Sequence, residues 1–404
     1  MRVVHINEHA AAVGGVEVYL LDLASRLSAE GIEQQYWFAH GGTDQVPCAA
    51  ISLPEIARIG RQAEAEGFLA AQSLLQNFRP DVIHVHRVYN PGVLRACLDY
   101  GRTVVTCHDY LYLCPAASFF HRRTQTICFR RAGPPCFAIT LWRRCLTPRP
   151  RYALAYYRRV RQFIGWKDRF AAVLCPSDSV RQRLLHHGFP AHRTHTLPYF
   201  CPLQPRDEPR PLPCQPAILF MGRLRPIKGY DIFVQSLGLL ANVTGILVGD
   251  LGDGKAELVR RLAERWGCAG RLEARPWASR TELPHLLARA SVFVFPSICP
   301  ETLGIVGLEA LSCGVPVVAS DVGGVRQWLR NGENGLLVPP KDPAALAAAV
   351  RQLLASPERL VDMGRVGITT IRAGFLPAQH VERLLALYDQ VAQSPHASSA
   401  SHHW

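Results

Sequence analysis

The sequence predicts an α/β protein built from two doubly wound domains, and three observations lead to this fold class. Short apolar strands alternate with helical runs in the first half of the chain, a proline-rich segment interrupts the pattern, and the alternation then restarts. Such alternation is typical of parallel strands joined by crossover helices. With 404 residues, 48% of them hydrophobic, the chain is long enough for two sizeable cores.

The first half is expected to form an N-terminal domain at residues 1–199. Its helices include one that runs from Val16 and ends at Gly31, and a second at 62–78, both with apolar residues at helical spacing. The expected buried strands are 3–7, 34–40, 81–86, 103–109 and 171–177. A segment rich in Cys and Arg, at 110–170, is predicted to be an insert in this domain.

The second half repeats the architecture after a linker. Residues 200–216 hold six prolines and are expected to connect the domains without regular structure. The C-terminal domain is expected at 217–375, with a helix at 342–355. Its expected strands are 217–222, 245–250, 291–297 and 315–321. A last helix at 376–393 is expected to pack back on the N-terminal domain, and the tail 394–404 is expected to be disordered.

Charge and hydropathy limit where the chain acts. No run of ~20 apolar residues is present, and MRVVHIN lacks the apolar core of a signal peptide, so cytoplasmic residence is expected. The net charge is +13, and residues 119–183 carry an excess of the same size. One basic face predicts an acidic partner, such as anionic lipid at the inner face of the membrane, a phosphorylated saccharide or nucleic acid.

Glycines, cations and acids follow the predicted strands. Gly14 and Gly15 follow the first strand, and His108 and Asp109 follow the strand at 103. In the second half, MGRLRPIKG places Arg223 and Lys228 just past a strand. Ligands bind at the carboxyl ends of parallel strands, and an Arg fork beside a Lys point charge suits a diphosphate.

The run PETLGIVGLEA raises a separate question, because Glu301 and Glu309 stand eight positions apart. On a continuous helix they would be about 12 Å apart along the axis. A pair of carboxylates that cleaves one bond lies roughly 5–9 Å apart. The spacing therefore predicts two contacts with one extended ligand and argues against a two-carboxylate hydrolase.

These motifs together resemble the retaining glycosyltransferases of the GT-B type, family 4. The resemblance rests on motifs that occur in the same order: GGVE (14–17), HD (108–109), GRLRPIKG (222–229), VGDLGDG (248–254) and ETLGIVGLE (301–309). It is continuous over 215–360 and weaker in the first half. It implies two Rossmann-like domains facing a central cleft, and a place in cell-envelope polysaccharide biosynthesis.

The resemblance also implies roles for residues. Arg223 and Lys228 would bind the diphosphate of a nucleotide-sugar, Glu301 the transferred sugar, Glu309 the ribose, and His108 the donor sugar, so that His108, Glu301, Arg223 and Lys228 form the catalytic set. A helix that begins near Thr302–Ile305 would direct its N–H groups at the phosphates. The further donor contacts would be Gly14, Gly15, Thr302, Leu303, Gly304 and Ile305, with Glu17 and Asp109 on the acceptor side.

Two segments depart from the family pattern. GGVRQW (323–328) stands where Gly-Gly-x-Pro-Glu is common, and LPYFCP replaces the usual Asn-Gly after the last strand of the first domain. The first departure leaves the role of that loop open, and the second affects the hinge.

The expected reaction is transfer of a sugar from a nucleotide-diphosphate donor to a saccharide or lipid-linked acceptor. Fixed cations and helix N–H groups would stabilise the leaving diphosphate, so no metal or other cofactor is expected for catalysis. The family implies substitution on the same face of the sugar. The alternatives are a sugar-nucleotide epimerase or phosphorylase of similar shape, and a non-catalytic protein that binds sugar nucleotide or anionic glycan.

The insert leaves two questions open. Cys114, Cys128, Cys136 and Cys145 are enough to hold a structural zinc or an iron–sulfur cluster, but their spacing matches no standard ribbon, and unpaired thiols are the alternative. In the segment 151–170, arginines alternate with Leu154, Tyr157, Val160 and Ile164. This basic helix either meets a membrane or anionic saccharide, or packs on the sheet as an ordinary amphipathic helix; nucleic-acid binding is the weaker alternative.

Overall fold

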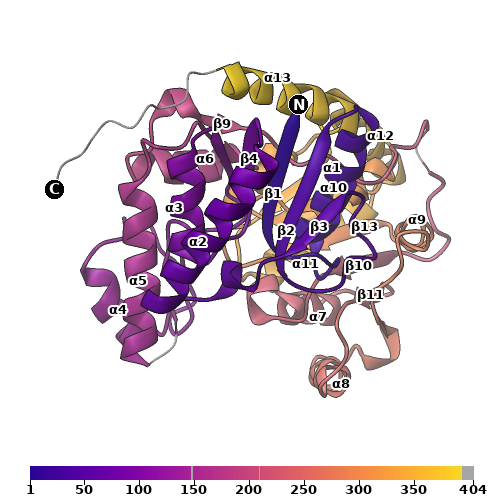
Figure 1. The fold of residues 1–404 in the computed structure, drawn as a ribbon. Helices are drawn as coiled ribbons and strands as arrows, with labels where there is room; N and C mark the ends of the chain where they lie inside the picture. The colour runs from indigo at the N-terminus through magenta and orange to yellow at the C-terminus, as the bar shows by residue number, and fades with distance from the viewer. Residues whose placement is uncertain (147–148, 209, 394–404) are drawn as a thin grey trace. The chain divides into compact units, whose positions relative to one another are not determined.

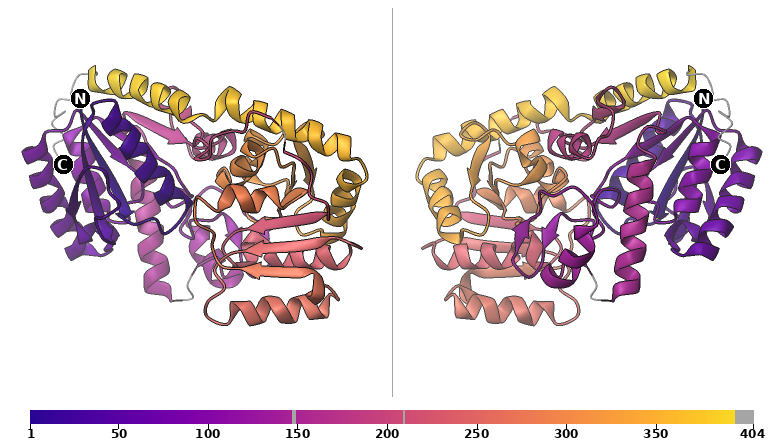
Figure 2. Two further views of the ribbon diagram at one scale, coloured as in Figure 1. Left: turned by 90° about the vertical axis from the view of Figure 1, so that its right-hand side faces the viewer. Right: turned by 90° about the vertical axis from the view of Figure 1, so that its left-hand side faces the viewer.

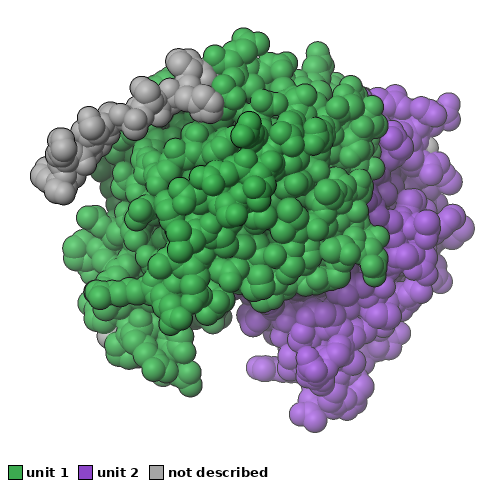
Figure 3. Space-filling model, viewed as in Figure 1, with its two compact units in different colours: residues 1–199, 378–404 green, residues 200–377 purple. Residues whose placement is uncertain are grey.

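The computed structural model describes residues 1–146, 149–208 and 210–393, and divides the chain into two compact units. Unit 1 contains residues 1–199 together with the chain from Ala378 onward, and unit 2 contains Phe200–Pro377 (Figure 3). The tail for which disorder is predicted, 394–404, lies outside the described residues. Each unit is built around its own parallel sheet, with helices along the sheet faces (Figures 1 and 2).

The sheet of unit 1 has seven parallel strands in the order β3-β2-β1-β4-β5-β8-β9. The strands are β1 (Arg2–His9), β2 (Glu33–His40), β3 (Ala49–Ser52), β4 (Val82–Val85), β5 (Thr103–Thr106), β8 (Ala172–Cys175) and β9 (Thr194–Thr196). The order reverses direction at β1, which pairs with β2 on one side and β4 on the other. Ligands of open parallel sheets bind beside such a switch point.

Helices cover this sheet, the first two of them close to where the periodicity predicts helices. They are α1 (Gly15–Ala29), α2 (Arg61–Phe78), α3 (Pro91–Tyr100), α5 (Pro150–Gly165) and α6 (Asp178–His186). The insert adds a short hairpin, β6 (Phe120–His121) with β7 (Thr126–Ile127), and α4 (Pro135–Arg143). The last helix, α13 (Pro377–Gln393), belongs to unit 1 from Ala378 onward.

Buried contacts fix α13 in unit 1. Its Tyr388 is fully buried, and the Tyr388 hydroxyl forms a hydrogen bond of 2.5 Å with Nδ1 of His84, on β4. Its His380 donates from Nδ1 to the carbonyl of Pro198 at 2.8 Å. Each bond satisfies a polar group that burial would otherwise make costly.

The sheet of unit 2 has six parallel strands in the order β12-β11-β10-β13-β14-β15. The strands are β10 (Ala217–Met221), β11 (Thr244–Val248), β12 (Leu272–Arg275), β13 (Val292–Phe295), β14 (Val317–Ser320) and β15 (Gly335–Val338). Around them lie α7 (Tyr230–Gly238), α8 (Lys255–Arg265), α9 (Leu283–Ala288), α10 (Ile305–Ser312), α11 (Pro343–Leu354) and α12 (Pro357–Gly374). The strands β10, β13 and β14 are buried throughout, as strands covered on both faces must be.

The proline-rich segment packs on unit 2. Its described residues form no helix or strand. Arg210 is 4% exposed and donates to the carbonyls of Ala288 and Ala290, and the N–H of Cys201 donates to Phe375 at 2.8 Å. The segment therefore lies along unit 2 although it lacks regular structure.

Candidate active site

The loop after β10 carries the two predicted phosphate-binding cations. Arg223 is exposed and Lys228 is half-buried. Asp250, just past β11, accepts from the N–H of Leu224 at 2.5 Å, so an acid of the neighbouring strand fixes the shape of this loop. Gly229 has φ +73, and a Cβ there would stand 2.0 Å from the carbonyl oxygen of Pro296. Only glycine fits that approach.

Lys228 and Glu301 are joined directly. The Lys228 ammonium lies 2.7 Å and 3.0 Å from the two carboxylate oxygens of Glu301, and Ser297 donates to Oε1 at 2.5 Å. Burial lowers the pKa of Lys228, but the Glu301 carboxylate outweighs this and the pKa is raised overall. Glu301 is 8% exposed and fixed by three bonds. A carboxylate offers about four lone-pair sites, so it keeps room for a further donor such as a sugar hydroxyl.

The loop at 323–327, which departs from the family pattern, holds the backbone of Glu301. The N–H of Gly324 donates to the Glu301 carbonyl at 2.7 Å. A Cβ on Gly323, whose φ is +55, would stand 2.1 Å from the same oxygen. The two glycines therefore position Glu301 from behind.

Helix α10 begins where the resemblance implies, and glycine sets its start. Gly304 caps the helix at φ +96, and a Cβ there would lie 2.9 Å from the Phe295 ring. Thr302 and Leu303 precede the helix, and Ile305 is its first residue. The first-turn N–H groups have no carbonyl partner within the helix, which makes this end attractive to anions.

The indole ring of Trp328 packs against α10. Its Nε1–H donates to the carbonyl of Leu303 at 2.7 Å, and the side chain is 1% exposed. A Cβ on Gly307, inside α10, would stand 2.2 Å from the indole ring. The Trp328 side chain, in the segment GGVRQW, thus fills the space next to Gly307 of α10. The sequence motif alone does not indicate this packing.

Glu309, the second predicted acid, lies in the second turn of α10 and is partly buried. Burial raises the pKa of Glu309 to about 7, against the opposing effect of Arg280. The two acids of the motif therefore differ in setting. Glu301 is paired and fixed, whereas Glu309 changes charge near neutral pH.

In unit 1, Glu17 and Asp109 meet around a single arginine. Arg87, just past β4, lies 3.4 Å from Asp109, 3.9 Å from Glu17 and 3.5 Å from Glu8. Burial acts to lower the pKa of Arg87, but these carboxylates raise it overall. Glu17 is 3% exposed, and its helix α1 has Gly14 as N-cap and Gly15 as first residue. Glu8 and Arg87 were not expected from the sequence, although both stand at strand ends.

His108 is buried, and both of its ring nitrogens are engaged. Nε2 lies 3.0 Å from Nδ1 of His86, and Nδ1 lies 2.6 Å from the hydroxyl of Tyr199. A contact with a donor sugar would therefore replace one of these bonds. The histidines of β1 and β4 were not among the predicted site residues. The signal was present in DVIHVH, where two histidines alternate on one face of a strand.

Among the described residues, no three of the four insert cysteines have their Sγ atoms all within 4.8 Å of one another. Cys114 and Cys128 pack against the core of unit 1, Cys136 lies in α4, and Cys145 follows that helix. Burial raises the pKa of the Cys145 thiol to about 11, and the other three thiols act in the same direction. In the described part of the chain, one group of three potential metal ligands has all its ligand atoms within 4.8 Å of one another. This group is His5, His84 and His86.

The structure corrects the predicted apolar stripe of α5. Leu154 is 38% exposed, whereas Arg159 is 4% exposed and donates to the carbonyl of Leu111 at 3.1 Å. Its guanidinium lies over the rings of Tyr89 and Tyr156. Val160 is buried as the spacing predicts, so the prediction is wrong at Leu154 and at Arg159. An arginine that is buried on aromatic rings looks like a solvated charge in a sequence.

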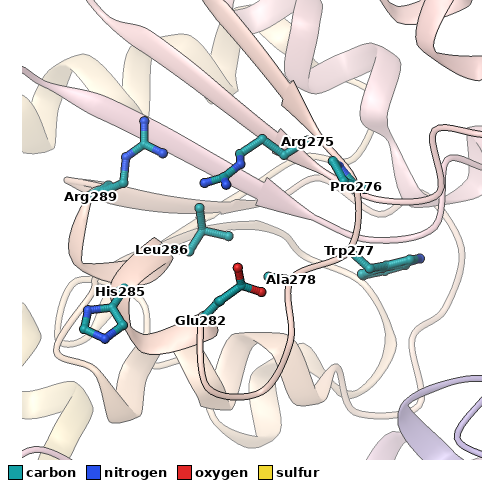
Figure 4. Close-up of a pocket in the computed structure, with 8 residues that line it drawn as sticks. All are labelled: Arg275, Pro276, Trp277, Ala278, Glu282, His285, Leu286 and Arg289. Carbon is teal, nitrogen blue, oxygen red and sulfur yellow. The ribbon is translucent and has the colours of Figure 1, made fainter.

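A cavity of about 250 Å³ lies at the end of β12, on the same edge of the sheet as the cation loop. Figure 4 shows the Arg275 guanidinium and the Glu282 carboxylate turned toward one space, with the Trp277 ring turned away. The sequence did not predict β12, whose residues are half charged, and so it missed this pocket.

Two family models match this chain. One, described as "Glycosyltransferase Family 4", matches residues 13–204, and the other, "Glycosyl transferases group 1", matches 215–356. Together they cover most of the chain. The chain belongs to the family 4 glycosyltransferases. The expected family is thereby confirmed.

The curated relatives of this chain include several D-inositol 3-phosphate glycosyltransferases. A D-inositol 3-phosphate glycosyltransferase of Geodermatophilus obscurus is 27% identical over 96% of this chain and 88% of its own length. One from Catenulispora acidiphila is 35% identical over 42% of this chain. That match covers 43% of the relative, so the chain spans less than half the length of some relatives it matches.

Solved structures confirm the fold class. A glycosyltransferase from Rickettsia africae superposes with a TM-score of 0.74 at 14% identity, covering 98% of this chain and 99% of that one. Anabaena HepE in complex with UDP-glucose gives 0.68 at 18% identity, covering 97% of this chain and 98% of that one. Each unit thus has the Rossmann-like architecture of the GT-B type. In the described part of this chain, no helix is both long and apolar enough to cross a bilayer.

Proposed function

We propose that the protein is a retaining glycosyltransferase that moves a sugar from a nucleotide-diphosphate donor to a saccharide or lipid-linked acceptor. One observation carries this proposal. In unit 2 the Lys228–Glu301 pair, at 2.7 Å, stands just before the N-terminus of α10, where cation, carboxylate and helix N–H groups can contact one extended donor. HepE, with the same fold, was solved with UDP-glucose.

In the proposed reaction, the groups that stabilise the leaving diphosphate are in position before the reaction begins. As the anomeric carbon becomes cationic, the leaving diphosphate gains negative charge, which Arg223, Lys228 and the first turn of α10 would stabilise without reorganising. The acceptor hydroxyl would attack from the same face, with the departing phosphate taking its proton. We propose that this step requires no metal.

The two acids divide the donor between them. Glu301 is held by Lys228 and Ser297, which suits a fixed contact with the transferred sugar. Glu309 is one turn into the helix, which suits the ribose. Glu309→Ala should then weaken binding of the bare nucleotide, and Glu301→Ala should change sugar selection and rate more. Equal effects on bare nucleotide affinity would contradict this division.

Unit 1 is proposed to supply the acceptor contacts. Glu17 and Asp109 around Arg87 can bind hydroxyl groups, and Gly14 and Gly15 allow backbone to approach the diphosphate. Arg159 adds a cation: within the described residues its Nε and Nη1 have no hydrogen-bond partner. The relatives are named for an inositol phosphate acceptor, so inositol 3-phosphate belongs in any acceptor screen.

The basic region is proposed to bring the protein to an anionic membrane from the cytoplasmic side, as in cell-envelope polysaccharide biosynthesis. Between residues 119 and 183, exposed apolar side chains stand among 14 arginines. They are Phe129, Trp142, Tyr152 and Leu154. Aromatic side chains among cations suit a bilayer interface.

A structural zinc or iron–sulfur cluster held by the four cysteines of the insert is also proposed. The presence of four thiols in one insert supports it, since such sites need four thiolates, and the thiols would have to move closer together to share one zinc ion. Elemental analysis of the purified chain tests the proposal. One zinc, or iron with sulfide, is expected, and four freely reactive thiols in a metal-free, folded chain would contradict it.

The experiment that tests the function incubates purified protein with labelled UDP-, GDP- and ADP-sugars and a panel of acceptors. Transfer of label with release of nucleoside diphosphate supports a glycosyltransferase. Conversion of the sugar without an acceptor would instead indicate an epimerase, and cleavage by phosphate a phosphorylase. Donor binding without turnover on any acceptor would indicate a binding protein.

A further inference from the structure

A row of buried hydrogen bonds crosses the sheet of unit 1 and ends at His108. It runs from Gln34 on β2 through His5 on β1 and His86, just past β4, to His108, just past β5. The steps are 3.1 Å from Gln34 to His5, 3.1 Å from His5 to His86, and 3.0 Å from His86 to His108. Tyr199 closes the row at 2.6 Å, and every member is at most 5% exposed.

The orientation of the Gln34 side-chain amide determines which atom donates in each hydrogen bond of the row. Its carboxamide nitrogen donates to the carbonyl of Ala24 and to Oγ of Ser28, both at 2.9 Å. A carbonyl oxygen can only accept, so the nitrogen must face α1 and the oxygen must face His5. Turning the amide over would set two acceptors against each other at Ala24.

The three histidines are neutral. Burial lowers the pKa of His5 to about 4 and that of His108 to about 3, and Arg87 adds to the effect at His108. Burial also lowers the pKa of His86 well below its usual range, with its histidine neighbours acting in the same direction. A neutral imidazole has one N–H and one bare nitrogen, so fixing one ring nitrogen fixes the other.

Because each ring is neutral, the hydrogen-bond direction at one histidine determines the direction at the next. His5 must donate from Nε2 to Gln34, which leaves its Nδ1 bare. His86 must therefore donate from Nε2 to His5, and His108 from Nε2 to His86. That leaves Nδ1 of His108 bare, and the Tyr199 hydroxyl donates to it.

We propose that Gln34 is a positioning residue that acts through His5 and His86 to hold His108 with its proton on Nε2. A ligand hydroxyl that displaces Tyr199 then meets an acceptor at Nδ1, so His108 would accept a hydrogen bond from the ligand. The consequence for the sugar rests on the proposed function, but the assignment of the protons does not.

Nitrogen-15 NMR of the histidine-labelled protein reads the position of each ring proton directly. His5, His86 and His108 are expected as the neutral Nε2–H form. Two other histidines provide the opposite reference within the same spectrum. His380 donates from Nδ1 to Pro198, and His187 donates from Nδ1 to the carbonyl of Arg183 at 2.7 Å. A His108 with its proton on Nδ1, or on both nitrogens, overturns the proposal.

Three variants locate the origin of the effect. Gln34→Met keeps the side-chain length and removes the acceptor, so an Nδ1–H signal should appear at His108. Gln35→Met, the same change at the next residue, should leave His108 unaltered, as should Tyr199→Phe, which removes the partner at the other end. A folded Gln34→Met with unaltered His108, or a switch caused by Tyr199→Phe, overturns the role of Gln34.

The wild-type spectrum decides the tautomer even if Gln34→Met does not fold. Neither measurement needs a donor or an acceptor. Failure of this proposal would thus leave the transferase proposal standing, and a protein without transferase activity could still show the predicted tautomers.

Discussion

Burial of Glu309, the proposed ribose contact, should make donor binding depend on pH. A carboxylate accepts hydrogen bonds from ribose hydroxyls best when ionised, and burial raises its pKa to about 7. The ionised fraction therefore rises as pH increases through 7. Between pH 6 and pH 8 the affinity for the nucleoside diphosphate should increase about tenfold from this group alone. Calorimetric titration of the wild-type protein at both pH values measures it.

The matched control separates this effect from titration of the nucleotide phosphate. Glu309→Gln should bind more weakly at pH 8 and lose the tenfold dependence. Glu382→Gln, on the exposed surface of α13, should keep it. An identical pH slope in the wild type and in Glu309→Gln would show that this carboxylate does not contact the nucleotide.

Gly304 tests how α10 begins. Its φ is +96 and a Cβ added there would stand 2.9 Å from the Phe295 ring, so Gly304→Ala should destabilise the protein by about 1–3 kcal/mol and weaken donor binding. Gly252→Ala has open space around its Cβ and should change stability by less than ~0.5 kcal/mol. Thermal unfolding compares them, and equal melting temperatures would refute the account of this helix start.

At the scale of elements, Trp328 joins the 323–327 loop to α10. Trp328→Phe removes the 2.7 Å bond to Leu303 and leaves part of the indole space empty, so a loss of about 2–4 kcal/mol is expected. Donor affinity should fall with it, because the helix start is displaced. Trp277→Phe, half-exposed at the β12 pocket, should leave stability nearly unchanged. Stability that is equally insensitive to both changes would contradict this role.

The insert should act as a membrane-contacting element. Co-sedimentation with anionic vesicles is expected for the wild type and should weaken at high salt, because surface charge is screened within ~10 Å at 0.1 M. Phe129→Ser with Trp142→Ser should reduce binding, whereas Leu69→Ser, equally exposed on α2, should not. Binding to neutral and anionic vesicles alike would argue against a basic docking surface.

At the scale of the whole molecule, the alternation of strands and helices was enough to predict the fold class. Strands that are apolar along their whole length, such as β10 and β13, carried a clear signal. β12, with LEAR, and β9, with THT, did not, because they are polar edge strands. Their place in the sheets depends on pairing with a neighbour, which no local pattern records.

The features of the candidate site likewise divide into those that the sequence indicated and those that it did not. The sequence indicated Lys228 and Glu301, since both follow strands that end at one edge of a sheet. It could not show that they pair at 2.7 Å, that Gly323 and Gly324 hold Glu301, or that Arg87 joins Glu17 to Asp109. These contacts join residues far apart in the chain. Arg159 and the histidine row were missed because burial reverses the usual meaning of a polar residue.

The central claim is sugar transfer at the Lys228–Glu301 site, and one measurement tests it most directly. Wild-type protein and Lys228→Ala are each incubated with labelled nucleotide-sugars and the acceptor panel, and labelled product and released nucleoside diphosphate are counted. The account predicts equal amounts of both from the wild type, a product that retains the donor's anomeric configuration, and at least a hundredfold lower rate in Lys228→Ala, about 3 kcal/mol of lost stabilisation. Transfer that Lys228→Ala leaves unchanged, or an inverted product, would contradict it.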